Sequence, residues 1–414
     1  MLSLRPHQQE CLDATQNHSK GIICAVTGAG KTLVGVADTM REFEQETPQT
    51  IVVVAPRIML ATQLSSEYLE HIDNVAVLHV HSGETHHFST TKPAEIQNWD
   101  QIVRVAFNPD APKHKLIFTT YHSLHKIMES GIKVNTIHFD EAHNSVQKNF
   151  YVATEYFSRK ADRCYFYTAT PKYSSTPKKP GMNNFQVYGN IIANVAAPRM
   201  VNEGYIIPPK IVAKQVSLSS INVFERDCNH LLESIDEAEV SKVLVCAKAT
   251  KQITSLISQT DFCQELESRG YSWMVITSKT GAIIDGKKVN REQFFDTLHD
   301  WSRDDSKKFV LLHYSILSEG INVSGLEAVI FMRSMDAIGI CQTIGRVVRL
   351  HHKDSARLRS GDLTPGHLSD YHKSYGLVII PTFNSVGIST AKKIQNVVDT
   401  VFNAGEPAIS TIKR

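Results

Sequence analysis

One short segment constrains this 414-residue chain more than any other: residues 25–32 read Ala-Val-Thr-Gly-Ala-Gly-Lys-Thr. An apolar run at 21–24 precedes the segment, and helix-compatible residues at 33–44 follow it. A strand, a glycine-containing loop and a helix in this order favour a phosphate-binding loop over a simple glycine turn, because loop N–H groups and the helix N-terminus then face phosphate oxygens. In such a loop, Lys31 reaches the β- and γ-phosphates and the Thr32 hydroxyl binds Mg²⁺.

A second segment places two carboxylates at the end of a predicted strand. Residues 134–139 are largely apolar, and Asp140 and Glu141 follow directly. Ligands bind at the carboxyl edge of an open α/β sheet. There Asp140 would hold Mg²⁺, which keeps several waters, and Glu141 would orient and deprotonate the attacking water. An acidic pair at a strand end is common on protein surfaces, but together with an upstream phosphate loop it indicates nucleotide hydrolysis.

Charge, cysteine and histidine content narrow the classes of partner. The 44 Lys and Arg nearly balance the 42 Asp and Glu, so any nucleic-acid contact comes from a local groove. The seven cysteines are scattered without CxxC spacing, which indicates reduced thiols in a cytosol-like compartment. The histidine pairs, including His351-His352, lack a metal-ligand framework, so we expect no structural metal.

The sequence offers no signal for a membrane. No apolar segment reaches the length needed to cross a bilayer, and residues 1–5 contain no apolar signal core. We therefore expect a soluble, intracellular protein without a membrane partner.

Strand and helix patterns alternate through both halves of the chain. Short apolar runs predict strands at 51–55, 116–120, 136–139, 164–167, 242–247, 273–277, 309–313, 329–331 and 377–380. Helical patterns occur at 60–71, 123–128, 222–237, 252–268 and 293–301. The alternation and the chain length predict two α/β domains, each a mostly parallel sheet with helices on both faces. We place these domains at residues 1–204 and 205–414.

Three further segments receive a structural interpretation only. Residues 83–115 are polar and contain three prolines, which predicts a long loop with a short helix. Residues 351–373 are mixed polar and basic, and we expect a solvated loop, with nucleic-acid contact as the less favoured alternative. Residues 389–403 fit an amphipathic helix ended by Gly405.

The residues Asp140-Glu141-Ala142-His143 resemble the box of the DEAH-type superfamily 2 helicases and translocases. That superfamily commonly has alanine at the first position of its phosphate loop, which accounts for Ala25 where the general pattern has glycine. Other motifs follow in the family's order, spanning about residues 4 to 350. In the first half they are Arg5-Pro6-His7-Gln8, Ala55-Pro56-Arg57 with Leu60 and Gln63, Thr119-Thr120-Tyr121 and Thr168-Ala169-Thr170-Pro171.

In the second half, two segments continue the resemblance. Residues 318–322 read Ser-Glu-Gly-Ile-Asn and resemble the fifth helicase motif, although most members have aspartate at the position of Asn322. Residues 342–349 resemble the sixth motif, Gln-x-x-Gly-Arg-x-x-Arg. On a helix Gln342, Arg346 and Arg349 would share one face, where arginine charge could stabilise the γ-phosphate during transfer.

The resemblance implies that the two α/β domains are tandem RecA-like domains, and it implies a role for each matching residue. Catalysis falls to Glu141, Gln342, Arg346 and Arg349. ATP is bound by Arg5, Gln8, Thr27, Gly28, Ala29, Gly30, Lys31, Thr32, Gly320 and Asn322. Mg²⁺ is held by Thr32 and Asp140. Hydrolysis is coupled to strand movement by His143, Thr168 and Thr170. Nucleic acid is contacted, without sequence specificity, by Pro56, Arg57, Gln63, Thr119 and Thr120.

Because these residues come from both predicted domains, we expect ATP to favour closure of the two domains and hydrolysis to release them. The junction around residues 188–209 resembles that of phage repair and recombination helicases and of restriction-enzyme helicase subunits. This resemblance favours DNA, branched or duplex, in repair, recombination or replication, and a phage or bacterial host cytoplasm. Three alternatives remain open: an RNA helicase, a duplex translocase that does not separate strands, and a nucleotide-gated binding protein without turnover. Protein partners remain unknown.

Overall fold

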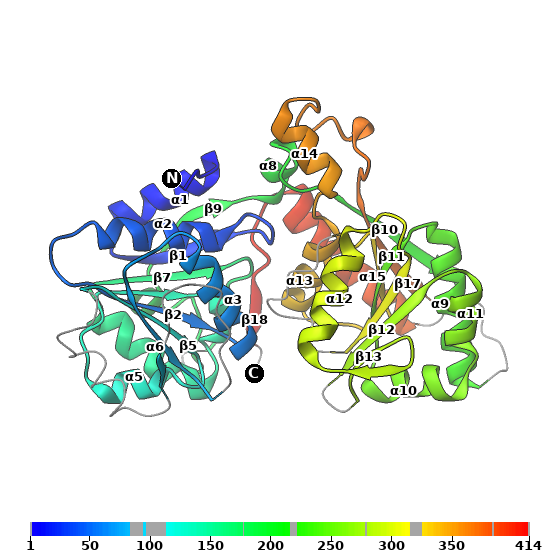
Figure 1. The fold of residues 1–414 in the computed structure, drawn as a ribbon, viewed down its shortest axis with the longest axis horizontal. Coiled ribbons are helices and arrows are strands. Elements are labelled where there is room, and N and C mark those ends of the chain that lie inside the picture. Colours follow the sequence, from blue (N-terminus) through cyan, green and yellow to red (C-terminus); the bar gives the residue numbers. More distant parts are fainter. Residues whose placement is uncertain are drawn as a thin grey trace. The chain divides into compact units, whose positions relative to one another are not determined.

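A computed structural model describes residues 2–82, 94–96, 113–176, 178–215, 222–277, 280–314, 325–382 and 385–412 (Figure 1). The described chain forms two compact units, one within Met1–Val195 together with Ile409–Arg414, the other within Ala196–Ala408. The units thus divide at residue 195, whereas the sequence analysis placed the division at residue 204. The segment around Gly320 and Asn322 lies outside the described residues, as does most of the predicted loop at 83–115.

The first unit is built on an eight-stranded sheet in which every neighbouring pair of strands is parallel, as predicted. The strand order is β4-β3-β5-β2-β6-β7-β1-β9. In chain order the strands are β1 (Lys20–Ala25), β2 (Thr50–Ala55), β3 (Ala76–Val80), β4 (Ala94–Ile96), β5 (Lys115–Thr120), β6 (Thr136–Phe139), β7 (Arg163–Thr168) and β9 (Ile191–Val195). Because the strands run parallel, β1, β2, β5, β6 and β7 deliver their carboxyl ends to one edge.

Helices cover both faces of this sheet. They are α1 (Pro6–Asn17), α2 (Lys31–Phe43), α3 (Ile58–Leu69), α5 (Leu124–Ser130), α6 (Lys148–Lys160) and α7 (Phe185–Tyr188), with a short 3₁₀ turn, η1 (Ala142–Asn144). Along β2 the pleat divides the core: Val52 and Val54 belong to the cluster with α5 and α6, and Val53 belongs to the cluster with α2 and α3. A continuous apolar strand is therefore buried on both faces.

The C-terminal strand β18 (Ser410–Ile412) pairs in parallel with β8 (Lys172–Ser174), so the end of the chain belongs to the first unit. Three-residue strands of this kind leave little sequence signal, and the sequence analysis did not predict this pair.

The second unit contains another eight-stranded sheet, ordered β10-β17-β16-β11-β15-β12-β13-β14. The strands are β10 (Pro209–Gln215), β11 (Lys242–Cys246), β12 (Ser272–Thr277), β13 (Gly281–Ile284), β14 (Lys287–Val289), β15 (Phe309–His313), β16 (Ala328–Phe331) and β17 (Gly376–Thr382). All pairs are parallel except those that β13 makes with β12 and β14. The fold class predicted from the sequence, two RecA-like α/β domains, is confirmed.

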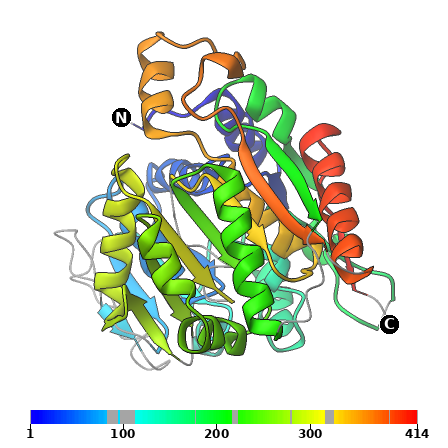
Figure 2. The same cartoon turned by 90° about the vertical axis from the view of Figure 1, so that its right-hand side faces the viewer.

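Two groups of helices sandwich this second sheet. They include α9 (Val223–Ala238), α10 (Thr250–Gln259), α11 (Phe262–Ser268), α12 (Arg291–Arg303), α13 (Ala337–Val347) and α15 (Ser385–Val398). The first three form one core cluster with Val243 and Val245 of β11, whereas α13 and α15 pack on β16 and β17 and α12 contacts β13. Figure 2 shows α15, in red, beside the strands at one edge of the sheet.

Two predictions about helices need correction. The helix expected at 252–268 is two helices, because the chain turns at Thr260 and Asp261 between α10 and α11. The solvated loop expected at 351–373 contains α14 (His352–Ser360) and a 3₁₀ turn, η3 (Leu368–Asp370), and it buries Asp354 and Lys373. Polar composition predicted a loop there, but buried polar residues can be accommodated when each has hydrogen-bond partners.

A buried carboxylate joins the elements around the phosphate loop. Asp38 of α2 is fully buried, and it accepts hydrogen bonds from the Thr15 hydroxyl at 2.9 Å and from His138 Nε2 at 2.9 Å. Arg41 and Arg163 form ion pairs with it. Burial alone would raise the pKa of Asp38, but the hydrogen bond and charge of His138, with the two arginines, lower it. The network thereby ties α1, α2, β6 and β7 together.

We expect the replacement Asp38→Ala to lower the free energy of unfolding of the first unit by about 3 kcal/mol, because it leaves the buried His138 and the half-buried Arg41 and Arg163 without this partner. Urea unfolding followed by circular dichroism measures this, with Asp13→Ala on the exposed side of α1 as control. The folded-state pKa is depressed, so the difference should persist at neutral pH and shrink as the pH falls below 3.8. Equal unfolding of both variants would contradict this role.

Candidate active site

The phosphate loop connects β1 to α2. Gly28 and Gly30 have φ angles of 94° and 75°, in the left-handed region, where only glycine is unstrained. Gly30 precedes the first residue of α2, Lys31, and a Cβ at Gly30 would lie 2.3 Å from Gln8 Nε2. Ala25, by contrast, is the last residue of β1 and has no positive φ. The loop therefore requires glycine at positions 28 and 30, and the alanine at 25 costs it nothing.

Side chains of the N-terminal helix α1 form hydrogen bonds with the backbone of the phosphate loop. The Gln8 side chain is buried and donates through Nε2 to the carbonyls of Ala29 and Gly30, at 3.3 and 3.2 Å. Its Oε1 accepts from the backbone N–H of Arg5 at 2.9 Å. His7 adds a hydrogen bond between Nε2 and the Ala29 carbonyl at 2.9 Å, a contact that the sequence analysis missed. Gln8 therefore fixes the backbone of the phosphate loop from α1. Its contact with adenine stays a prediction.

Lys31 and the acidic pair lie close to the same loop. Lys31 Nζ donates to the Ala25 carbonyl at 3.2 Å. The backbone N–H of Asp140, just after β6, donates to the Val54 carbonyl at 2.9 Å, and the Tyr121 hydroxyl donates to the Asp140 carbonyl at 2.8 Å. Burial and the neighbouring Glu141 raise the pKa of Asp140, and Lys31 opposes this. Two close, partly buried carboxylates beside one lysine form a site that a divalent cation would stabilise.

The residues assigned to coupling form a continuous chain of contacts. Glu141 adopts a left-handed φ of 45°, and its Oε2 lies 3.5 Å from His143 Nδ1. His143 Nδ1 is also 3.2 Å from Thr168 Oγ1, which accepts the backbone N–H of Thr170 at 3.1 Å. Asn144, which no motif had singled out, contacts His143 Nε2 at 3.3 Å through its amide. The carboxylate expected to activate water is therefore linked to the segment that follows β7.

The residues assigned to nucleic acid lie at the carboxyl ends of two adjacent strands, β2 and β5, and on α3, the helix that follows β2. Arg57 is exposed, Pro56 is half-buried, and Gln63 on α3 donates to Glu67 at 2.7 Å. Thr119 and Thr120, however, are buried, and the Thr119 hydroxyl donates to the Val80 carbonyl at 2.9 Å. In this structure the accessible groups of the set are thus Pro56, Arg57 and Gln63, and the nucleic-acid contacts stay predictions.

In the second unit, α13 carries Gln342 and Arg346. The Asp336 carboxylate caps this helix by accepting the N–H of Gly339 at 2.8 Å. The motif spacing predicted Arg349 on the same helix, and this prediction is wrong, because α13 ends at Val347. The chain leaves the helix there, where Ile207 N–H donates to the Val348 carbonyl at 2.8 Å and Arg349 pairs with Ile206.

Arg346 lies within electrostatic reach of two buried side chains at the ends of β11 and β15. Cys246 Sγ and His313 Nε2 are 3.2 Å apart. Burial, then the charge of Arg346, lowers the pKa of His313 to about 3, so the imidazole is neutral. Arg346 and Arg333 both act on His313, which adds positive charge around this buried imidazole.

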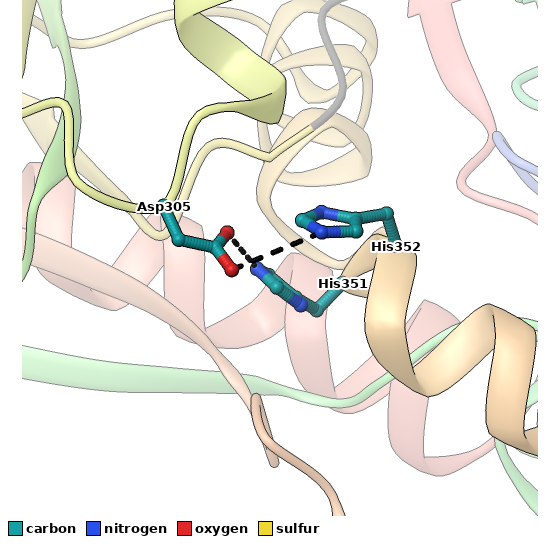
Figure 3. A group of neighbouring side chains, drawn as sticks. All are labelled: Asp305, His351 and His352. Atoms are coloured by element: carbon teal, nitrogen blue, oxygen red, sulfur yellow. Dashed lines mark hydrogen bonds and ion pairs between the residues drawn. The ribbon is translucent and has the colours of Figure 1, made fainter.

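A cluster of Asp305, His351 and His352 brings its possible ligand atoms within 4.8 Å of one another (Figure 3). Asp305 Oδ1 lies 3.0 Å from His351 Nε2, and Lys353 Nζ contacts Asp305 Oδ2 at 2.5 Å. His351 Nδ1 accepts the N–H of Lys353 at 3.3 Å and so caps α14. With Nδ1 accepting, the proton of a neutral imidazole sits on Nε2, facing Asp305. These contacts describe an ion-pair network that fixes the start of α14.

No helix in the described part of the chain is both long and apolar enough to span a membrane. Among curated proteins, none matches this chain in sequence.

Two family models match successive parts of the chain. Residues 1–173 match "Type III restriction enzyme, res subunit", and residues 226–351 match "Helicase conserved C-terminal domain". The first covers the phosphate loop and Asp140 to Thr170, and the second covers Gln342, Arg346 and Arg349.

Solved structures share the fold over nearly the whole chain. One is the ATP-dependent Type ISP restriction-modification enzyme LlaBIII bound to DNA, with a TM-score of 0.73 and 16% identity. Another is a nuclease-deletion mutant of the Type ISP enzyme LlaGI in complex with a DNA substrate mimic, with a TM-score of 0.66 and 18% identity. Each alignment covers 99% of this chain but only 31% and 30% of those chains, so this chain spans about a third of their length. Together, the two family models, with the fold that these structures share, identify this chain as a superfamily 2 helicase, an ATPase related to the helicase subunits of restriction enzymes.

Proposed function

We propose that this chain is an ATP-driven motor that moves along DNA, as a helicase or a translocase, without sequence specificity. The observation that carries the proposal is the chain of contacts in the first unit from Glu141 through His143 to Thr168 and Thr170. It links the carboxylate beside the phosphate loop to the segment after β7. Such a link is what an enzyme needs when hydrolysis must drive movement rather than occur alone.

The residues of the first unit fit ATP with Mg²⁺. Gly28 and Gly30 shape the loop, Lys31 supplies its positive charge, and Thr32 and Asp140 offer oxygen ligands of the type that Mg²⁺ prefers. The bound cation would neutralise phosphate charge during transfer. Glu141 is then the group that orients and deprotonates water, and it has a left-handed backbone conformation just after the carboxyl end of β6.

We further propose that the second unit supplies the positive charge for the transferred phosphate. Arg346 and Arg349 are the groups for this role, since an arginine presents fixed donors that match phosphate oxygens, and Gln342 would add an uncharged hydrogen bond. Residues 1–195 would bind ATP, and the second unit would respond to it. DNA is favoured because the structural relatives are DNA complexes, and Arg57 with Gln63 would contact its phosphates. Repair, recombination or replication in a phage or bacterial cytoplasm is the setting that we infer.

The first prediction concerns the polynucleotide. ATP turnover should rise about tenfold or more with DNA and less with RNA of equal length, because the solved structures that share this fold are DNA complexes. The measurement is the ATPase rate with single-stranded, duplex and forked DNA and with RNA. Triplex displacement and fork unwinding then separate a duplex translocase from a helicase. Stimulation by RNA alone would replace DNA with RNA as the substrate, and no turnover with any polynucleotide would overturn the proposal.

The second prediction concerns coupling. Thr168→Val keeps the shape of a buried side chain but removes the hydroxyl shared by His143 and Thr170. We expect DNA-stimulated turnover to fall about tenfold or more, while ATP binding stays near normal. Thr154→Val is the matched control, because Thr154 is equally buried in the same unit and its hydroxyl donates to a helix carbonyl. If both variants behave alike, the hydroxyl has no coupling role.

The third prediction concerns the arginines. Arg346→Ala should lower the maximal ATPase rate by on the order of 10³-fold, as loss of an arginine that stabilises transferred phosphate does in other NTPases. Affinity for a non-hydrolysable ATP analogue should change far less, because the proposed binding loop lies in the first unit. DNA-stimulated turnover close to that of the unchanged protein would remove Arg346 from the mechanism.

A further inference from the structure

In the second unit, the buried Lys373 binds the backbone at and just after the end of α13, the helix that carries Arg346. Lys373 lies between η3 and β17 and is only 7% exposed. Its ammonium donates to three backbone carbonyls: that of Leu326 at 2.6 Å, that of Val347 at 2.7 Å and that of Arg349 at 3.1 Å. A lysine ammonium has three N–H donors, so the three carbonyls engage all of them.

These carbonyls belong to the two stretches that carry the helicase motifs of this unit. Val347 is the last residue of α13, so its carbonyl is one of those that the helix leaves unbonded, at the negative end of the helix dipole. Arg349 follows two residues later, where the helix has already ended. Leu326 comes four residues after Asn322 in the sequence. One side chain thus joins the chain after the fifth motif to the end of the sixth.

The lysine is itself held in place. The carboxylate of Asp354, fully buried on α14, accepts the N–H of His372 at 2.8 Å and that of Lys373 at 3.0 Å. Burial lowers the pKa of Lys373 to about 7, and Glu327 and Asp354 oppose this while Arg349 reinforces it. The interior therefore disfavours the charged form of this lysine, and its three carbonyl partners favour it. Buried charges of this kind are costly unless their hydrogen bonds hold something in place.

We propose that Lys373 is a positioning residue for the ATPase reaction, which fixes the backbone from which Arg349 projects and the end of the helix that carries Arg346. The inference rests on the proposed function of these two arginines. The three backbone carbonyls engage all the N–H groups of the Lys373 ammonium, so Lys373 acts on where the arginine side chains begin. Without it, α13 loses the lysine that binds its last carbonyl, and the Arg349 carbonyl loses the same donor, whereas the contacts of Val348 and Arg349 with Ile206 and Ile207 remain.

Lys373→Met tests this, because methionine fills similar space but donates no hydrogen bond. Lys242→Met is the matched control: Lys242 is also buried in this unit, its pKa is also lowered, and its ammonium donates to Ser302, outside the arginine segment. We expect the maximal DNA-stimulated ATPase rate to fall 10- to 100-fold in Lys373→Met and by less than threefold in Lys242→Met. KM for ATP should stay within about threefold in both. Equal rates in the two variants, or a rise in KM alone, would overturn the proposal.

A second variant and a second readout cover the case in which Lys373→Met folds poorly. Lys373→Gln keeps two amide N–H donors, and its rate should lie between those of the unchanged protein and the methionine variant. Hydrogen exchange should quicken in peptides covering 325–328 and 344–350 in the Lys373 variants and not in Lys242→Met. Unchanged exchange there would overturn the positioning role. If the unchanged protein lacks DNA-stimulated turnover, the proposed function fails, while exchange still reports separately on Lys373.

Discussion

The buried carboxylate of Asp38 is the constraint on which the geometry of the first unit depends. It lies on α2 about two helix turns after Lys31, the first residue of that helix, and its partner His138 lies two residues before Asp140. A buried charge needs hydrogen-bond donors in fixed places, so the contacts of Asp38 favour the arrangement in which α1, α2, β6 and β7 meet around it. That arrangement puts Lys31 and the acidic pair at the same edge of the sheet.

The second unit also contains a buried charge that connects distant segments, but this charge is positive. There a buried cation, Lys373, is matched by carbonyl groups rather than by a carboxylate. In both units a buried charge connects segments that are distant in the sequence. Neither Asp38 nor Lys373 is itself among the residues predicted to bind or hydrolyse ATP. Apolar packing between helices and sheets is non-directional, whereas a hydrogen-bonded charge specifies which groups must meet. Apolar packing in the cores stabilises the two units, and the hydrogen bonds of Asp38 and Lys373 determine which segments meet.

Much of the fold was predictable because periodicity and position reflect local physics. The apolar runs at 51–55, 116–120 and 309–313 became β2, β5 and β15 with nearly the predicted bounds, since a strand buried on both faces has no alternative but continuous apolar residues. Short elements escaped prediction. The pair formed by β8 and β18 is three residues long on each side, and its stability comes from a partner more than 200 residues away, which no local pattern records.

The amino-acid sequence by itself determined the chemistry of the site: glycines at 28 and 30, Lys31, the acidic pair and the arginines are residue types in an order that indicates nucleotide hydrolysis. It also determined the alternation of strands and helices and hence the fold class. Only the tertiary structure decided that Arg349 lies outside the helix, that Thr119 is buried, and that Asp38 and Lys373 hold the site from behind. These features depend on contacts between residues far apart in the chain, and burial and hydrogen bonding exist only once those residues meet.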